Sequence, residues 1–194
     1  LEEAFDANGN DSMSGQTLTD TTTISESSNE SATIIDDISD GDISEYTDYK
    51  GGMYTVSNDR SYSGEYSIKA AGGENAFLAD DGELGTVSQG MKFSMRVYMG
   101  SSDTEAGILF GVQSEDRKNW YNAEYKAPQN RLSIFRDNES RETVTVANKE
   151  NVTLPGGEWL KFEIEWDDGS LSGQEGDITF TVKDESGTIL EQIS

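Results

Sequence analysis

The chain has 194 residues, of which 33% are hydrophobic, and it carries a formal net charge of −24. Asp and Glu total 38 against 14 Lys and Arg, which disfavours nucleic acids and anionic membrane surfaces as partners, because phosphates attract cationic surfaces. The sequence contains no histidine and no cysteine, so disulfides and mechanisms that use a thiolate or an imidazole are excluded. No stretch reaches the roughly 18 apolar residues of a membrane span.

The acidic residues are spread along the whole chain rather than gathered in one tail. In dilute salt their mutual repulsion destabilises a compact state, whereas molar salt shortens the screening length to roughly 3 Å. Dispersed carboxylates, scarce lysine and many small polar residues resemble the proteins of halophilic archaea and their viruses. An ordinary acidic secreted domain is the alternative. We expect an extracellular, cell-surface or virion-surface location.

Residues 1–33 are rich in Ser, Thr, Asp, Glu and Asn and contain few apolar side chains. This composition predicts a flexible linker or a solvated stalk. The alternative is an extended arm that becomes ordered as a strand on another subunit, which would make the protein a homo-oligomer. Residues 6–11 begin like a calcium loop, but Asp11 and Thr17 stand where such a loop needs Gly and Glu, so no calcium is expected there.

From residue 34 onward, short runs of alternating apolar and polar residues follow one another along the chain. In MKFSMRVYM, residues 91–99, the odd positions are apolar and the even positions are Lys92, Ser94, Arg96 and Tyr98. Successive side chains of a strand point to opposite faces, so this run predicts one face for the core and one for solvent. Comparable runs predict strands at residues 52–57, 65–71, 107–113, 119–127, 131–136, 142–148, 159–166 and 177–184.

Gly-containing turns separate these runs, and no window of useful length shows the 3.6-residue apolar period of an amphipathic helix. Many short alternating strands joined by such turns are typical of a sandwich or a jelly roll. The predicted fold is therefore all-β: an antiparallel β-sandwich of jelly-roll type over residues 34–194, preceded by an extended polar N-terminal arm.

Three segments carry a resemblance to a known family: SYSGEYSIKAAG (61–72), GGEWLKFEIEWDDGS (156–170) and GDITFTVKDESGTIL (176–190). Their order and spacing resemble the concanavalin A-like lectin/glucanase superfamily, especially its laminin-G-like members. The resemblance covers about residues 40–194 and concerns strand packing more than chemistry. Members usually finish with one more strand, so it implies that this chain lacks its closing strand and is a segment of a longer protein.

Glucanases of this superfamily use paired carboxylates on one strand. The nearest candidates are Glu163 and Glu165, followed by Asp167. The residues between them form an apolar stripe, so we predict that these carboxylates lie on a solvated outer face and that the domain is not an enzyme. Trp159 and Trp166, which flank the same run, are expected to be packing residues.

Sugars are bound by aromatic rings together with hydrogen bonds from polar neighbours. Residues 116–125, DRKNWYNAEY, concentrate such side chains, and the alternation turns Trp120 and Asn122 away from the core. This pair is the first candidate glycan platform, and the alternative is that Trp120 caps the edge of the core. Tyr98 and Arg96 share the polar face of another strand and are the second candidate.

Asp167, Asp168 and Asp177 flank the turn DDGSLSGQEGD. The resemblance implies calcium as a cofactor here, since laminin-G-like domains often bind this ion through Asp side chains at a sandwich edge; a solvated turn is the alternative. The Asn-x-Ser/Thr pattern marks candidate glycosylation sites. These are Asn10, Asn29, Asn138 and Asn151.

Taken with the family resemblance, these features predict a non-catalytic recognition or adhesion module with a glycan as its first expected ligand. The rival interpretation is a purely structural role, as a tail, spike or capsid-decoration component of a virion or as a surface-filament subunit. Neighbouring protein subunits would then be the partners.

Overall fold

A computed structural model gives the architecture of the chain. It describes residues 3–5, 17–18, 23–26, 33–34, 38–44, 46–48, 54–70, 77–80, 89–100, 105–111, 120–137, 142–167 and 177–194. The strands are β1 (Glu3–Phe5), β2 (Thr17–Leu18), β3 (Thr23–Glu26), β4 (Thr33–Ile34), β5 (Tyr46–Asp48), β6 (Tyr54–Ser57), β7 (Ser67–Ala70), β8 (Phe77–Asp80), β9 (Met91–Met99), β10 (Glu105–Phe110), β11 (Trp120–Lys126), β12 (Arg131–Asp137), β13 (Thr143–Glu150), β14 (Glu158–Trp166), β15 (Ile178–Lys183) and β16 (Ile189–Ile193). A short 3-10 helix, η1 (Ala127–Gln129), joins β11 to β12.

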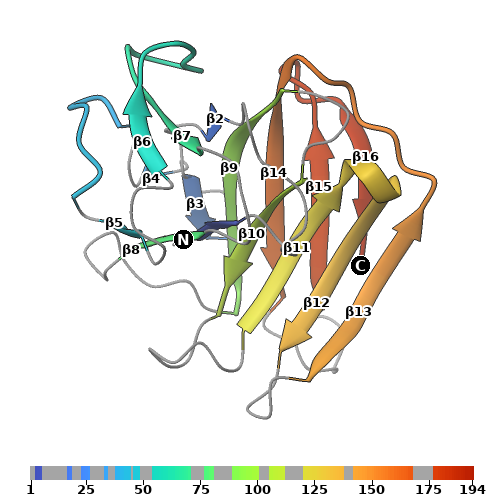
Figure 1. Ribbon diagram of the computed structural model, residues 1–194. Helices are drawn as coiled ribbons and strands as arrows, with labels where there is room; N and C mark the ends of the chain where they lie inside the picture. Colours follow the sequence, from blue (N-terminus) through green and yellow to red (C-terminus); the bar gives the residue numbers. More distant parts are fainter. Residues whose placement is uncertain are drawn as a thin grey trace.

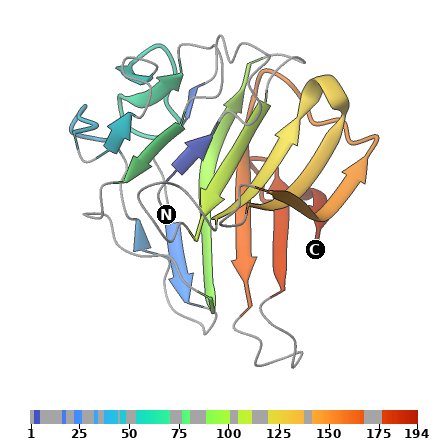
Figure 2. The same ribbon diagram turned by 60° about the horizontal axis from the view of Figure 1, so that its bottom comes forward.

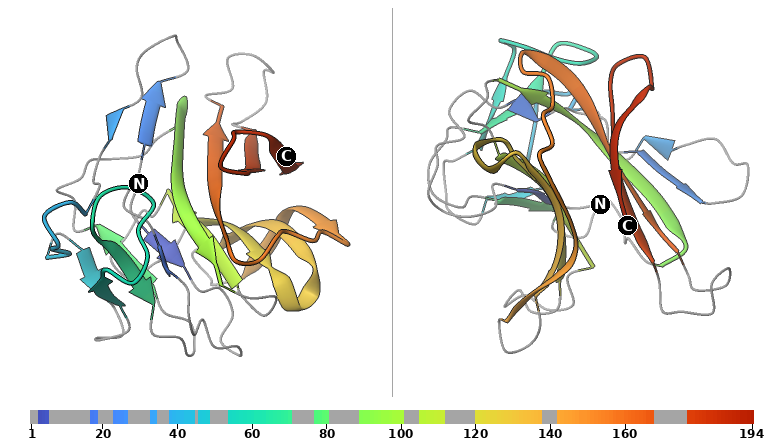
Figure 3. Two further views of the ribbon diagram at one scale, coloured as in Figure 1. Left: turned by 90° about the horizontal axis from the view of Figure 1, so that it is seen from above. Right: turned by 90° about the vertical axis from the view of Figure 1, so that its right-hand side faces the viewer.

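The strands form two antiparallel sheets that pack against each other (Figure 1; Figure 3). In sheet A the order is β13-β12-β11-β10-β1-β8-β5. In sheet B the order is β16-β15-β14-β9-β2-β7-β6, with β3 also paired to β9 and β4 paired to β3. No α-helix occurs in the part of the chain that the structure describes. The predicted all-β sandwich is confirmed.

The alternating runs of the sequence become strands of this sandwich. β9 has the predicted bounds, and β6, β7 and β11 to β15 overlap their predicted ranges. β10 also overlaps its predicted range but is displaced from it. The prediction covered residues 107–113, and the strand runs from Glu105 to Phe110. Gly111 follows it with φ +67°, a conformation that suits glycine and interrupts a strand.

Four short strands come from the polar N-terminal region. β1 lies between β10 and β8 in sheet A, and β2 lies between β9 and β7 in sheet B. β3 pairs with β9 further along the same sheet, as Figure 2 shows with blue β3 beside green β9. The region that the sequence predicts as an arm thus contributes strands to the sheets of its own chain. The division of the chain at residue 33 stays a prediction.

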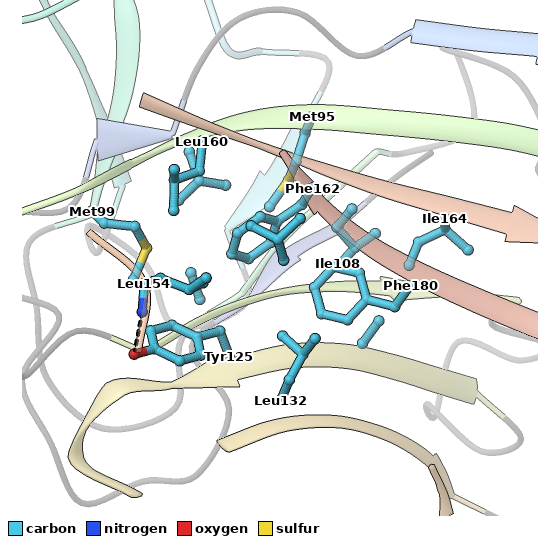
Figure 4. Close-up of a cluster of buried hydrophobic side chains, with 14 of the residues drawn as sticks. Met95, Met99, Ile108, Tyr125, Leu132, Leu154, Leu160, Phe162, Ile164 and Phe180 are labelled. Atoms are coloured by element: carbon cyan, nitrogen blue, oxygen red, sulfur yellow. Dashed lines mark hydrogen bonds between the residues drawn. The ribbon is translucent and has the colours of Figure 1, made fainter. Parts of the chain in front are cut away.

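The core lies between the inner faces of the two sheets (Figure 4). Phe93 packs edge-on against Phe110 with ring centroids 5.2 Å apart, and Phe162 against Phe180 at 5.3 Å. Burying one such side chain stabilises the fold by about 1.5–3 kcal/mol. The aliphatic and sulfur-containing members fill the space around these rings. They include Met95, Val97, Met99, Ile108, Leu132, Ile134, Leu160, Ile164 and Val182.

The connection from sheet A to sheet B, residues 151–157, is fastened to the core by Tyr125. The hydroxyl of Tyr125 accepts a hydrogen bond from the backbone N–H of Leu154 at 3.2 Å (Figure 4). The backbone N–H of Val152 donates to the carbonyl of Asn130 at 2.8 Å. These bonds satisfy buried backbone groups and hold the connection against the β11–β12 end of sheet A.

Candidate functional site

The outer face of sheet B carries a cluster of three aromatic rings. Tyr98 of β9 lies opposite Trp159 of β14 in the strand register, and their ring centroids are 5.2 Å apart at 74°. Tyr62, from the connection between β6 and β7, meets Trp159 edge-on at 6.1 Å. All three side chains are half-buried, so this aromatic cluster of Tyr62, Tyr98 and Trp159 is packed and still reaches solvent.

Two arginines hold the tyrosine rings of the aromatic cluster. The guanidinium of Arg60 lies 4.3 Å from the ring centroid of Tyr98, and that of Arg96 lies 4.3 Å from the ring centroid of Tyr62. A cation over an aromatic face is attracted by the ring quadrupole, by about 0.5–1 kcal/mol at an exposed site. The two arginines therefore restrain the rings before any ligand arrives.

The connection that carries Arg60 and Tyr62 is itself tied to sheet B. The hydroxyl of Ser67, a buried residue of β7, donates to the backbone carbonyl of Arg60. The ammonium of Lys69 lies 2.6 Å from a carboxylate oxygen of Asp59, and the hydroxyl of Ser61 donates to the carbonyl of Gly64 at 2.9 Å. The loop is fixed at both of its ends, which fixes Tyr62 against Trp159.

A pocket of about 400 Å³ opens beside the aromatic cluster. Its walls come from the start of β14, from β9 and from the turn between β15 and β16. Gly157 lies in this wall with φ +80°, and its N–H donates to the carbonyl of Met99 at 2.6 Å. The lining residues are Tyr98, Gly157, Glu158, Trp159, Asp184, Glu185 and Ser186.

The turn on the far side of the pocket is held by Asp184. One of its carboxylate oxygens accepts hydrogen bonds from the hydroxyl of Ser186 at 2.6 Å and from the N–H of Thr188 at 2.9 Å. These bonds, with that from Ser186 the strongest, lower the pKa of Asp184 below its ordinary value. The pocket thus combines an aromatic wall with a rim of hydrogen-bond acceptors, which is the composition of a site for a polar ring.

Next to the aromatic cluster, three lysines converge on one glutamate. The carboxylate of Glu163 lies 3.0 Å from Lys92, 3.0 Å from Lys161 and 2.6 Å from Lys183. The lysines come from β9, β14 and β15, three neighbouring strands. We call these four residues the lysine cluster.

Glu163 is only 5% exposed, so the prediction that it lies on a solvated face is wrong. Burial by itself raises the pKa of Glu163, but hydrogen bonds from Lys183, Lys92 and Lys161 outweigh it and hold the pKa at about 2. The three lysine side chains surround the carboxylate, and Ser94, which lies opposite Glu163 in β9, is also buried. Glu165, one step further, is 57% exposed.

The first predicted platform, Trp120 and Asn122, lies on the other sheet, in β11. Trp120 is half-buried, whereas Asn122 is 2% exposed and its amide donates to the carboxylate of Glu124 at 2.8 Å. The alternation did turn both residues away from the core, but this face of sheet A is covered at Asn122. The expectation of an open platform is therefore wrong for Asn122, and a binding role for Trp120 stays a prediction.

Glu124, beside Asn122, is a fully buried carboxylate. The ammonium of Lys126 lies 3.3 Å from it, and Lys126 is buried as well. The pKa of Glu124 is raised to about 7: burial is the main cause and the nearby charge of Glu105 adds to it, while Lys126 and Asn122 oppose the rise. Nothing in the sequence pattern distinguishes this buried ionisable group from a solvated one.

Of the second predicted pair, Tyr98 and Arg96, both belong to the site on sheet B. Sequence reasoning missed Tyr62, and it assigned Trp159 to packing. The alternation along β14 already indicated where Trp159 lies. Trp159 is two residues before Lys161 and so shares its outer face, whereas the adjacent Leu160 faces the core and is buried. Trp166 does pack, with its ring 5.5 Å from Phe110.

The candidate calcium ligands and sequons are described only in part. The N–H of Asp167 donates to the carbonyl of Asp177 at 2.9 Å, and Asp168 lies outside the described residues. Within the described ranges, no group of three or more His, Cys, Asp or Glu side chains could hold a metal ion, and calcium stays a prediction.

Asn151 is exposed and begins the connection to β14 with φ +62°. The other sequon residues, Asn10, Asn29 and Asn138, lie outside the described residues, and glycosylation at all four stays a prediction. No helix in the described part of the chain has the length and apolar character to cross a membrane.

In comparisons with known proteins, the chain matches no family model, no curated protein and no solved structure.

Proposed function

We propose that this protein is a non-catalytic recognition or adhesion module at an extracellular, cell or virion surface, and that it binds a glycan on the outer face of sheet B. The observation that carries the proposal is the pocket walled by Tyr98 and Trp159. A sugar presents an apolar face of C–H groups and an edge of hydroxyls. The aromatic wall suits the first, and the rim of carboxylate and hydroxyl groups suits the second.

The restraint of the aromatic cluster supports the same function. Ordering a side chain at an interface costs about 0.5–1.5 kcal/mol of binding free energy. Here Arg60 and Arg96 already hold the tyrosine rings, so less ordering is left for the ligand to impose. The resemblance to laminin-G-like domains favours the same kind of role.

The carboxylates on this sheet face favour a binder over a glycosidase. A glycosidase needs one carboxyl group that can deliver a proton near neutral pH. Glu163 is held in the ionised form by three lysines, which opposes that role. We therefore propose that Glu163 and Glu165 are not a catalytic pair.

A glycan array probed in multimolar KCl tests the proposal. Trp159→Ala and Tyr98→Ala are expected to abolish binding of any glycan that the unaltered protein retains. Trp120→Ala is the matched control, because Trp120 is also a half-buried tryptophan but lies on sheet A. Loss with Trp120→Ala and retention with Trp159→Ala would move the site to sheet A.

A structural role, as a virion component or a surface-filament subunit, is the second candidate. It is favoured by β13, which ends the strand order of sheet A and exposes Val144 (53%) and Val146 (47%). Residues 143–148 of β13 carry no charged side chain, and an exposed edge strand of this kind can pair with another chain. A register shift between β12 and β13 interrupts the edge, which opposes pairing along its full length. Light scattering of the protein and of Val144→Lys in high salt tests this role through the oligomeric state.

A further inference from the structure

We infer that the glycan bound at this site carries an anionic group, a carboxylate or a sulfate, which lies over the lysine cluster. This inference rests on the proposed glycan-binding function and names the class of ligand. It starts from the distribution of charge over the molecule. The chain has 14 basic residues against 38 acidic ones, so a gathering of cations on one face requires a physical reason.

A row of three cations crosses sheet B beside the aromatic cluster. The strand register places Arg96 opposite Lys161, and Lys161 opposite Lys183. Neighbouring strands lie about 4.8 Å apart, so this cationic row extends across the sheet at the scale of one sugar unit and its substituent. Trp159 lies two residues before Lys161 in β14, on the same face of the sheet, and two residues of a strand span about 7 Å.

Among the described residues, the carboxylates beside the lysine cluster do not fully balance its ammonium charges. Glu163 carries one negative charge and is shared by three lysines. Glu165 lies 3.7 Å from Lys92 and is largely exposed. Among the described residues, Glu163 and Glu165 bring two negative charges to the three ammonium groups of the lysine cluster. One positive charge is left in excess, and a carboxylate or sulfate of the ligand would neutralise it.

The position of the remaining carboxylates sets the orientation of the ligand. Glu158, Asp184 and Glu185 line the pocket on the other side of Trp159, where they repel an anion and accept hydrogen bonds from hydroxyls. An acidic sugar would place its apolar face on Trp159, its hydroxyls toward the pocket and its acidic group over the cationic row.

The test compares ligands that differ in one group. Affinities are measured for a hexuronic acid oligosaccharide, for the same oligosaccharide with its carboxyls reduced to alcohols, and for a sulfated hexose oligosaccharide. We expect the acidic ligands to bind at least about tenfold more tightly than the reduced one, because hydrogen bonds between charged groups are the stronger class. Their advantage should shrink as KCl is raised.

Lys161→Gln/Lys183→Gln should remove the preference for the acidic ligands, so that the acidic and the reduced ligands bind this variant with similar affinity. Lys161→Gln alone leaves Glu163 two lysine partners and serves as the second variant if the double variant does not fold. Lys149→Gln is the matched control, because Lys149 pairs with Glu191 on β16, away from this cluster. Trp159→Ala should weaken the binding of all of the saccharides.

The outcomes separate this inference from the proposed function. Equal affinity for the acidic and reduced ligands, with both lost in Trp159→Ala, would overturn the inference and keep the glycan site. A preference that survives the double lysine variant would also overturn it. Binding of polyglutamate as tight as that of the hexuronic acid ligand, with the same lysine dependence, would overturn the assignment to a saccharide. Absence of binding to every saccharide would overturn the proposed function, and the inference with it.

Discussion

Replacing Glu163 with glutamine removes the one carboxylate that holds Lys92, Lys161 and Lys183 together. The ordinary pKa of a glutamate is 4.5, and in the folded protein the pKa of Glu163 lies at about 2. Each pKa unit corresponds to about 1.4 kcal/mol, so the full difference corresponds to about 3 kcal/mol. The lysines are partly exposed and solvent screens part of the interaction, so we expect Glu163→Gln to lower the free energy of unfolding by about 2 kcal/mol at pH 7.

The sign of the pH dependence follows from the lowered pKa. In the unfolded chain Glu163 takes up its proton near pH 4.5, and in the folded chain only near pH 2. Between these values the unfolded state binds more protons, so the stabilisation is present above pH 4.5 and is lost as the pH falls toward 2. The difference in stability between the unaltered protein and Glu163→Gln should therefore shrink over this range.

Urea unfolding in multimolar KCl, followed by circular dichroism at several pH values between 7 and 2.5, measures this difference. Glu165→Gln is the matched control, because Glu165 is mostly exposed and its one ion pair among the described residues is at 3.7 Å. It should change stability by less than about 0.5 kcal/mol. The reasoning is refuted if the two variants behave alike, or if the effect of Glu163→Gln does not change with pH.

Three further changes test other parts of the structure. Burial raises the pKa of Glu124 to about 7, so the folded state binds this proton more tightly than the unfolded state does. The contribution of Glu124 to stability should therefore decline as the pH rises from 4.5 to 7. Urea unfolding should show that the stability difference between the unaltered protein and Glu124→Gln changes over that range, and a constant difference would count against this reasoning. Gly107→Ala should destabilise the fold by about 1–3 kcal/mol, because the added Cβ would lie 2.8 Å from the carbonyl of Ala123 and 2.9 Å from Asn122 Oδ1. A thermal melt equal to that of the unaltered protein would contradict this. Tyr125→Phe should cost about 1–3 kcal/mol, because it leaves the buried N–H of Leu154 without its acceptor; an unchanged urea midpoint would show that the bond does not stabilise the connection.

The strands of the sandwich and their inner faces could be predicted from the sequence. In the run that became β14, Leu160, Phe162 and Ile164 alternate with polar residues, and all three are buried in the core. Side-chain parity along an extended strand is a local property of the backbone, so a single run of residues is enough to show it. The same property would have placed Trp159 on the outer face.

The first thirty-four residues contain strands that the sequence pattern does not predict. β1, β2, β3 and β4 lack the long alternation of the later strands, and two of them are only two residues long. They pair through backbone groups with strands such as β9 and β10. Backbone hydrogen bonds form whatever the side chain is, so the sequence of such a segment does not indicate its pairing.

The composition of the candidate site was decided by the tertiary structure. Lys92, Lys161 and Lys183 are separated by long stretches of chain and meet at Glu163 only because β9, β14 and β15 lie side by side in one register. Asn122 and Glu163 both have the parity of surface residues, yet both are buried. The amino-acid sequence by itself determined which way each side chain points from its strand, because that depends on the period of the backbone. The neighbours that each side chain meets, and whether water reaches it, depend on contacts between strands far apart in the chain, and those exist only in the folded molecule.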